Sequence, residues 1–290
     1  MMKQSDSTNQ IITLENGRKL GFAEFGRPEG VPVFFFHGFP GSRLDWFLFN
    51  AEETAVEMNA RIIVVDRPGM GLSDFQSGRM ILDWPADVIE VADVLQINRF
   101  SLLAASGGAP YGLACAHKIP DRLKATTIVS GMGPADAPGA KDGSSWSIPG
   151  KPSLLRRVLL TMLVQGLKKP ERMLSQTKDS FSGPDAALIE VHPEIADVII
   201  ESWGEAFRAG IGGVNHDAGL YTRSWGFQLQ DVTAPVHLWH GGQGDGNVLA
   251  SVGRYVADSL PNCKATFLED EGHFSMIYNH MEDILSLLAA

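Results

Sequence analysis

The chain has 290 residues, of which 44% are hydrophobic and 20% charged, a composition typical of a folded globular protein and not of a disordered one. Lys and Arg number 24 against 34 Asp and Glu, so the net charge is -10. We therefore expect no nucleic-acid partner, because binding phosphate backbones needs a clustered basic excess. We also expect no membrane span and no signal peptide. Two cysteines, Cys115 and Cys263, are too few for a disulfide framework, and these features favour a cytoplasmic location.

The first half of the chain alternates between strand and helix patterns. Two short strands are expected around Asn16-Gly17, a dipeptide that favours tight hairpin turns. Further strands are expected at 31–38, 61–66, 99–105 and 124–131, with helices at about 42–59, 80–97 and 107–123. This alternation favours a parallel sheet covered by helices.

The alternation returns near the C-terminus, with strands at 235–241 and 263–270 and helices at about 248–260 and up to Leu288. Between the two parts, residues 133–231 are first rich in Gly, Pro and Ser and then helical without strand patterns. We predict one α/β core made of residues 10–132 and 232–290, with residues 133–231 inserted as a helical cap.

A buried strand runs directly into Ser106, in the segment AASGG, and small residues then open a helix. Such a strand–turn–helix elbow lifts a serine hydroxyl above the sheet edge, and its neighbours are small because the turn brings strand and helix backbones together. The usual pattern is G-x-S-x-G, whereas this chain has Ala104 in the first place. An ordinary serine cap of a helix is the alternative. We predict Ser106 as a nucleophile.

A serine hydroxyl needs a base beside it to act as a nucleophile near neutral pH. His273, in EDEGHFS, follows a strand on a glycine loop at the carboxyl edge of the expected sheet, where catalytic groups of such sheets collect. Asp245, in HGGQGDGNV, follows another strand and is the predicted carboxylate that orients the imidazole. Asp136, in the loop after 124–131, is an alternative acid.

Negative charge that develops on a carbonyl oxygen needs fixed hydrogen-bond donors. The N–H of Gly107, just after the serine, is one candidate. The loop HGFPGS follows an early buried strand and offers the backbone N–H of Phe39 as the second.

The segments HGFPGS, DRPGMGLSD, AASGGAPYGLACA, WHGGQGDGNV and GHFS together resemble the cap-bearing serine esterases of the α/β-hydrolase superfamily, from about residue 10 to 290 without the insertion. The resemblance implies a mostly parallel eight-stranded sheet with helices on both faces, a helical cap, and no cofactor or metal. It also implies a nucleophile at Ser106, an acid at Asp245 and a base at His273, in the family's chain order. Counted from His240, the segment HGGQGD is one residue longer than the family's usual H-G-x-x-D spacing. Counted back from Asn247-Val248, Asp245 is at the family's usual position. A serine at the elbow excludes haloalkane dehalogenases and epoxide hydrolases, which attack with an aspartate there.

Other residues have structural interpretations that we prefer. Asp66 and Arg67 are expected to form a charged pair that shapes the loop after 61–66. Residues 155, 159 and 163 give the segment 151–173 an apolar stripe, which either packs the cap on the core or forms a basic-flanked mouth for acyl chains or lipid surfaces.

Aromatic and acidic residues of the insertion bear on the substrate. Trp146, Trp203 and Trp225 are expected to wall a substrate pocket, or else to pack the cap. The acidic residues are interpreted as a solvated helix face, with binding of a substrate amine as the alternative: Asp185, Glu190, Glu194, Asp197, Glu201 and Glu205.

These observations predict a carboxylesterase that cleaves small to medium acyl esters through an acyl-enzyme intermediate, with a small-molecule ester as its partner. The alternatives are a prolyl-aminopeptidase-like enzyme, a C–C or thioester hydrolase with the same residues, and a non-catalytic ligand-binding protein on this fold. The natural substrate and the oligomeric state are not indicated by the sequence.

Overall fold

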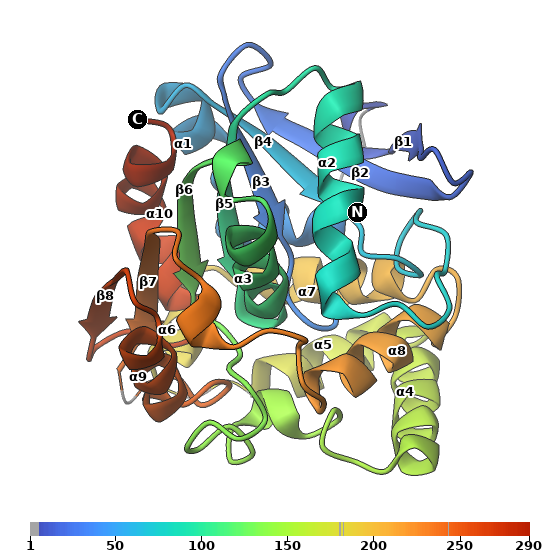
Figure 1. The fold of residues 1–290 in the computed structure, drawn as a ribbon. Coiled ribbons are helices and arrows are strands. Elements are labelled where there is room, and N and C mark those ends of the chain that lie inside the picture. The colour runs from blue at the N-terminus through green and yellow to red at the C-terminus, as the bar shows by residue number, and fades with distance from the viewer. Residues whose placement is uncertain (1–5, 180, 182, 243) are drawn as a thin grey trace.

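A computed structural model of the chain describes residues 6–179, 181, 183–242 and 244–290 (Figure 1). Its centre is an eight-stranded sheet in the order β1-β2-β4-β3-β5-β6-β7-β8. The strands are β1 Gln10–Thr13, β2 Lys19–Gly26, β3 Val31–Phe36, β4 Ala60–Val65, β5 Phe100–Ala105, β6 Leu123–Val129, β7 Val236–Gly241 and β8 Cys263–Leu268. Strand β2 is antiparallel to both β1 and β4, and the other neighbours are parallel. The predicted mostly parallel, eight-stranded sheet is confirmed.

Helices cover both faces of this sheet. The helices are α1 Glu52–Glu57, α2 Trp84–Val94, α3 Ala109–Lys118, α4 Ser153–Leu167, α5 Pro170–Asp179, α6 Gly183–Val191, α7 Glu194–Ala206, α8 Gly212–Tyr221, α9 Ala250–Ser259 and α10 Ser275–Leu288. Helices α2, α3 and α9 share one hydrophobic cluster with one sheet face, and α1 and α10 share another cluster with the opposite face. In β3, Phe34 and Phe36 belong to the first cluster and Val33 and Phe35 to the second. Burial on both faces explains why this strand is a continuous apolar run.

The strand register brings the ends of the central strands to one edge of the sheet. Phe36 pairs with Ala104, Ala105 pairs with Val129, and Gly241 pairs with Leu268. The loops that follow β3, β5, β6, β7 and β8 therefore all leave from the carboxyl edge. These loops contain the residues that the sequence predicts as catalytic.

Helices α4 to α8 lie between β6 and β7 in the chain, and this part contains no strand among the residues that the structure describes. They gather beyond one end of the sheet (Figure 1). They fall in the segment predicted as a cap, 133–231, although its division from the core as a separate unit stays a prediction.

Local differences from the expected elements have simple causes. The helix expected at 42–59 is broken into a short 3-10 helix η2 (Arg43–Phe49) and α1, because Asn50 adopts a left-handed conformation with φ 46°.

The expected hairpin turn is confirmed: Gly17 has φ 83°, and its N–H donates to the carbonyl of Leu14 at 2.9 Å. Within the described ranges, no helix combines the length and apolarity needed to cross a membrane.

Candidate functional site

Ser106 directly follows β5 and begins the 3-10 turn η4 (Ser106–Gly108) that leads into α3. Its φ of 50° is in the left-handed region, which costs a non-glycine residue about 1–3 kcal/mol and is typical of functional sites. Gly108 is required here, because a Cβ on it would lie 2.2 Å from the carbonyl oxygen of Phe36. The alanine at 104 fits because it faces Gly112 of α3, where a Cβ would lie 2.7 Å from the Ala104 methyl.

His273 lies on the loop after β8, and its Nδ1 is 3.0 and 3.1 Å from the two carboxylate oxygens of Asp245. One of these oxygens also accepts the backbone N–H groups of Asn247 and Val248, at 2.9 and 2.8 Å, which fixes the loop after β7. The alternative acid, Asp136, is an exposed residue of the loop after β6. The structure therefore brings Asp245 to the imidazole.

Electrostatics favour the ionic form of this buried pair. Burial lowers the pKa of His273, but the charge and hydrogen bond of Asp245, with a further contribution from Asp185, raise it above its ordinary value. Burial raises the pKa of Asp245, but His273 lowers it overall. A neighbouring carboxylate strengthens the imidazole as a base, because it stabilises the protonated ring.

The two predicted oxyanion donors lie side by side. A Cβ on Gly107 would lie 3.1 Å from the backbone nitrogen of Phe39. The carbonyl that shares a peptide unit with the Phe39 N–H is that of Gly38, and it accepts a hydrogen bond from Arg67 at 2.7 Å. The carbonyl that shares a peptide unit with the Gly107 N–H is that of Ser106, which accepts from the N–H of Met132 at 3.0 Å. Both peptide units are therefore held from their carbonyl side.

The expected pairing of Asp66 with Arg67 is wrong. Arg67 donates instead to Asp217 of α8 at 2.7 Å and to the carbonyl of His37 at 2.6 Å. Asp217 also binds Arg79 and the hydroxyl of Tyr111. Arg67 therefore joins the loop after β3 to α8, which lies between β6 and β7 in the chain. Sequence spacing could not reveal this pair, because Arg67 and Asp217 are 150 positions apart.

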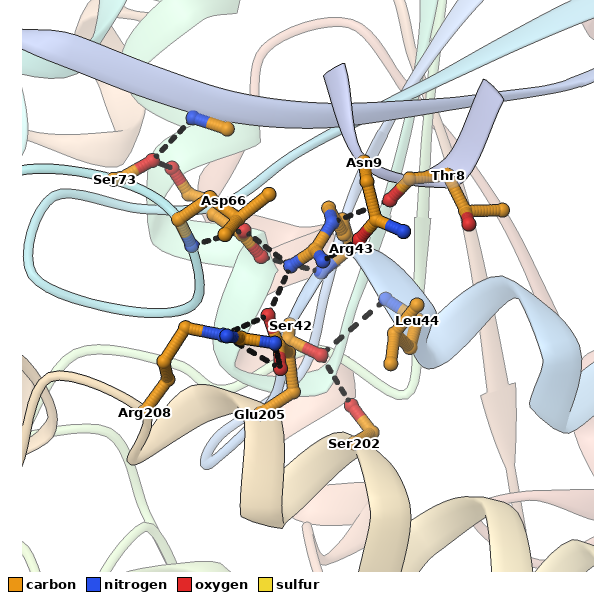
Figure 2. A network of polar contacts seen from close by, with 12 residues as sticks. Thr8, Asn9, Ser42, Arg43, Leu44, Asp66, Ser73, Ser202, Glu205 and Arg208 are labelled. Atoms are coloured by element: carbon orange, nitrogen blue, oxygen red, sulfur yellow. Dashed lines mark hydrogen bonds and ion pairs between the residues drawn. The ribbon is translucent and has the colours of Figure 1, made fainter. Parts of the chain in front are cut away.

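Asp66 pairs with Arg43, whose Nη1 lies 2.9 Å from the Asp66 carboxylate and 2.5 Å from that of Glu205 (Figure 2). The carboxylate of Asp66 also accepts the backbone N–H of Leu72 at 2.9 Å. The predicted role of Asp66 in shaping the loop after β4 is thus confirmed. In the same network Ser42 of the β3 loop lies 2.8 Å from Ser202 of α7, hydroxyl to hydroxyl (Figure 2).

A cavity of ≈ 530 Å³ lies at this edge, and both Ser106 and His273 line it. Part of its wall is apolar and is made by residues of β3, β6, η2, α7 and α10: Phe35, Leu48, Phe49, Val129, Ile199 and Ile277. Another part is polar and includes Ser144, Ser145 and Asn247. A cavity of this size with a few polar groups is typical of a small-molecule site.

Of the three tryptophans predicted as pocket walls, Trp203 lines the cavity. The prediction is wrong for Trp146 and Trp225, which are buried in the hydrophobic cluster of α2, α3 and α9. The stripe expected on α4 is partly right, because Leu163 lines the cavity, whereas Leu155 is exposed.

The predicted solvated acidic face is confirmed for Glu190, Glu194 and Asp197, which are exposed, and Glu201 is half-buried. It is wrong for Asp185 and Glu205, which are buried. Glu205 binds Arg43 and Arg208. Asp185 accepts the backbone N–H of His273 at 2.9 Å.

Asp45 is a cavity residue that the sequence analysis did not single out. Its carboxylate accepts the backbone N–H groups of Gly38, at 2.9 Å, and Ser42, at 3.3 Å, and the hydroxyl of Ser202. The spacing Ser42-x-x-Asp45 is that of a capping box and could have placed Asp45 at a helix start.

No cluster of metal-ligating side chains occurs in the part of the chain that the structure describes.

Several curated proteins match parts of the chain. An uncharacterized hydrolase, YcgS, of Bacillus subtilis is 27% identical over 123 residues, which are 42% of this chain and 41% of that protein. A proline iminopeptidase of Neisseria gonorrhoeae is 31% identical over 111 residues, 36% of this chain and 34% of that protein. A non-heme chloroperoxidase of Streptomyces lividans is 30% identical over 125 residues, 42% of this chain and 45% of that protein. The chain thus spans less than half the length of each of these relatives.

Solved structures match over nearly the whole chain. An alpha/beta hydrolase fold protein from Nakamurella multipartita has a TM-score of 0.69 at 22% identity, covering 96% of this chain and 99% of that one. A hydrolase from Pseudomonas aeruginosa has a TM-score of 0.71 at 18% identity, covering 99% and 100%. At these identities the likeness concerns the fold. The family model described as the alpha/beta hydrolase family matches residues 33–286, and the chain belongs to this family.

Proposed function

We propose that this member of the alpha/beta hydrolase family is a serine carboxylesterase that acts on small to medium acyl esters. One observation carries the proposal: Ser106 at a left-handed strand–helix turn and His273 bonded to Asp245 line the same cavity. Phe39 also lines this cavity, and its backbone nitrogen lies beside Gly107. This arrangement supplies a nucleophile, a base with its orienting carboxylate, and two backbone donors.

In the proposed mechanism, the Ser106 hydroxyl attacks the ester carbonyl while Nε2 of His273 accepts its proton. Nδ1–H of His273 donates to Asp245, which stabilises the imidazolium. The N–H groups of Phe39 and Gly107 hold the oxyanion. His273 then protonates the leaving alcohol, and a water molecule releases the acyl group from Ser106 by the same route.

Two acidic residues bear on the aminopeptidase alternative, which the iminopeptidase relative raises. An amine-binding carboxylate needs a lone pair directed at the substrate. Glu205 is bonded to Arg43 and Arg208, and Asp185 accepts three backbone N–H groups. Because these carboxylates already have partners within the protein, the ester substrate is the better supported one.

The test is hydrolysis of p-nitrophenyl acetate, butyrate and octanoate by the wild type, Ser106→Ala and the control Ser145→Ala. Ser145 also lines the cavity but is not at the elbow. We expect wild-type and Ser145→Ala turnover, and loss of at least about 10³-fold in Ser106→Ala. Full activity in Ser106→Ala would assign the chemistry to another residue.

Further substrates separate the alternatives. Prolyl-p-nitroanilide tests the aminopeptidase, and an acyl thioester and a C–C substrate test the related hydrolases. A serine-reactive fluorophosphonate should label the wild type and not Ser106→Ala. Absence of both labelling and turnover in the wild type would favour a non-catalytic binding protein.

A further inference from the structure

We propose that the insertion completes the site through the first turn of α6, and that Asp185 is a positioning residue for His273. This inference rests on the proposed function. One oxygen of the Asp185 carboxylate accepts the N–H of His273 at 2.9 Å. The other accepts the N–H groups of Phe274, at 2.9 Å, and Ser275, at 3.0 Å. A side chain of the insertion thus holds the backbone of the proposed base.

The Asp185 carboxylate occupies the N-terminal end of α10, which begins at Ser275. A helix N-terminus has free N–H groups and a partial positive charge, so a carboxylate there is stabilised. Asp185 is buried, with 5% of its surface exposed. Three N–H groups and the helix end therefore account for the presence of a buried carboxylate at this position.

The loop that carries His273 is shaped to receive this carboxylate. A Cβ on Gly272 would lie 2.5 Å from an Asp185 oxygen, so only glycine leaves the necessary room. The N–H of Gly272 donates to the Ser275 hydroxyl at 2.8 Å, which fixes the same turn from the other side. Every other residue at 272 would displace either the carboxylate or the loop.

The neighbouring residue of α6 contacts the loop of the proposed acid. A Cβ on Gly244 would lie 2.9 Å from the ring of Pro184, and Gly244 directly precedes Asp245. Two consecutive residues of α6 therefore touch the loops that carry Asp245 and His273. Movement of this helix turn would disturb both members of the pair.

Asp185 also acts on His273 through its charge. Three ionisable groups lie near the imidazole. Asp245 is bonded to its Nδ1, and Asp185 accepts the backbone N–H of His273. His240 lies 4.0 Å from Asp245. Glu271, two positions earlier, is paired with His280 at 3.0 Å. The negative charge of Asp185 raises the pKa of His273, so removing that charge should make the imidazole a weaker base.

The test compares pH profiles of kcat/KM for p-nitrophenyl butyrate in the wild type, Asp185→Asn and Glu190→Gln. Glu190 is an exposed carboxylate on the same helix and is the matched control. In Asp185→Asn we expect the acid limb to move to lower pH and kcat to fall about 10–100-fold, because a misplaced base costs rate and not affinity. KM should change less than about twofold. Glu190→Gln should match the wild type.

A folded Asp185→Asn enzyme with the wild-type acid limb and kcat would overturn the inference. If Asp185→Asn does not fold, Asp185→Glu tests the positioning role instead. It keeps the charge but moves the carboxylate by one methylene, so kcat should fall while the acid limb stays. Wild-type kcat in that variant would contradict a positioning role.

A second readout separates this inference from the proposed function. The NMR titration of the His273 ring reports its pKa without any turnover. A lower pKa in Asp185→Asn supports the contact even if no ester is hydrolysed, in which case only the proposed function fails. An unchanged pKa together with normal ester turnover defeats the positioning role alone.

Discussion

Tyr221 donates its hydroxyl proton to the carbonyl oxygen of Gly107 at 2.9 Å. Tyr221 ends α8, and Gly107 directly follows the proposed nucleophile. The Tyr221 ring also packs edge-on against Phe39, with ring centroids 5.2 Å apart. One side chain of the insertion thus contacts both residues proposed to hold the oxyanion. Together with Arg67 and Asp217, Tyr221 links the geometry of the two proposed oxyanion donors to the placement of α8.

Tyr221→Phe should destabilise the fold and slow the enzyme. The variant leaves the buried carbonyl of Gly107 without its donor, a loss of about 1–3 kcal/mol, and lets the elbow relax. Urea unfolding and kcat on p-nitrophenyl butyrate measure the two effects. Tyr255→Phe, at a half-buried position of α9, is the control. Equal stability of the two variants would mean that the hydroxyl contributes nothing to the elbow.

Asp245→Asn should lower kcat by about 10³–10⁴-fold, because an amide cannot hold the imidazole in the required tautomer or stabilise its charge. Asp136→Asn should stay within about twofold of the wild type, since Asp136 is exposed in its loop. Steady-state kinetics of both variants on one ester decide between the two acids. The reverse pattern would assign the orienting role to Asp136.

The central features of the fold and site were predictable because they depend on local sequence. Buried strands end in turns with glycine or small residues, and parallel strands bring those ends to one edge. Ser106, Asp245 and His273 each follow such a strand, so the segment that contains each residue also determines its position. The glycine at 112 that accommodates Ala104 is likewise close in the chain.

Contacts of the insertion were not predictable in this way. Asp185 lies 88 positions from His273, and Asp217 lies 150 positions from Arg67. The acidic helix pattern that contains Asp185 also describes a solvated surface, and no sequence motif marks Asp217. The pocket prediction is wrong for Trp146 and Trp225 for a related reason, because a large aromatic residue packs in a core as readily as it lines a cavity. Only the tertiary arrangement separates these outcomes.

Asp217→Asn should destabilise the fold by about 3–5 kcal/mol at neutral pH, because it leaves two buried guanidinium groups without their counter-charge. Burial raises the pKa of Asp217, but Arg79 and Arg67 lower it well below its usual range. The stabilisation is therefore present above the ordinary pKa of an aspartate and is lost only in strong acid. The control is Asp93→Asn, which breaks the exposed pair with Arg122 and should cost at most about 1 kcal/mol. Similar losses of unfolding free energy in the two variants would contradict a special role for the buried cluster.

The stability of Asp45→Asn relative to the wild type should increase as the pH rises from about 5 to about 7.5. Burial raises the pKa of Asp45 to about 6, and its bonds to Ser202 and Gly38 offset this only in part. A raised folded pKa gives stability that is present below the unfolded pKa and lost as pH rises through the folded value. The wild type therefore loses up to about 3 kcal/mol as the pH rises from the ordinary pKa of an aspartate to above about pH 6.5. The variant has no such pH dependence, but its NH2 group cannot accept the donors that Asp45 binds, so the comparison concerns the change with pH and not the absolute stability.

Urea unfolding of Asp45→Asn and the wild type at about pH 5 and about pH 7.5 measures this difference. We expect the variant to gain roughly 1–1.5 kcal/mol on the wild type between the two pH values, because the remainder of the loss in the wild type has already occurred by pH 5. A constant gap at both values would show that Asp45 does not titrate between them. The activity of the variant reports separately on the loop of Gly38, whose N–H is bonded to Asp45.

Trp203→Ala should shift the acyl-chain preference toward longer esters. Trp203 lines the cavity together with the apolar residues Ile199 and Ile277. Removing its ring enlarges the space that an acyl chain can occupy there. Each additional buried methylene of a substrate contributes about 0.8 kcal/mol, so the ratio of kcat/KM for octanoate to that for butyrate should rise several-fold. Leu154→Ala is the control, since Leu154 is 76% exposed on α4. An unchanged ratio in folded Trp203→Ala would mean that the acyl chain does not lie against Trp203.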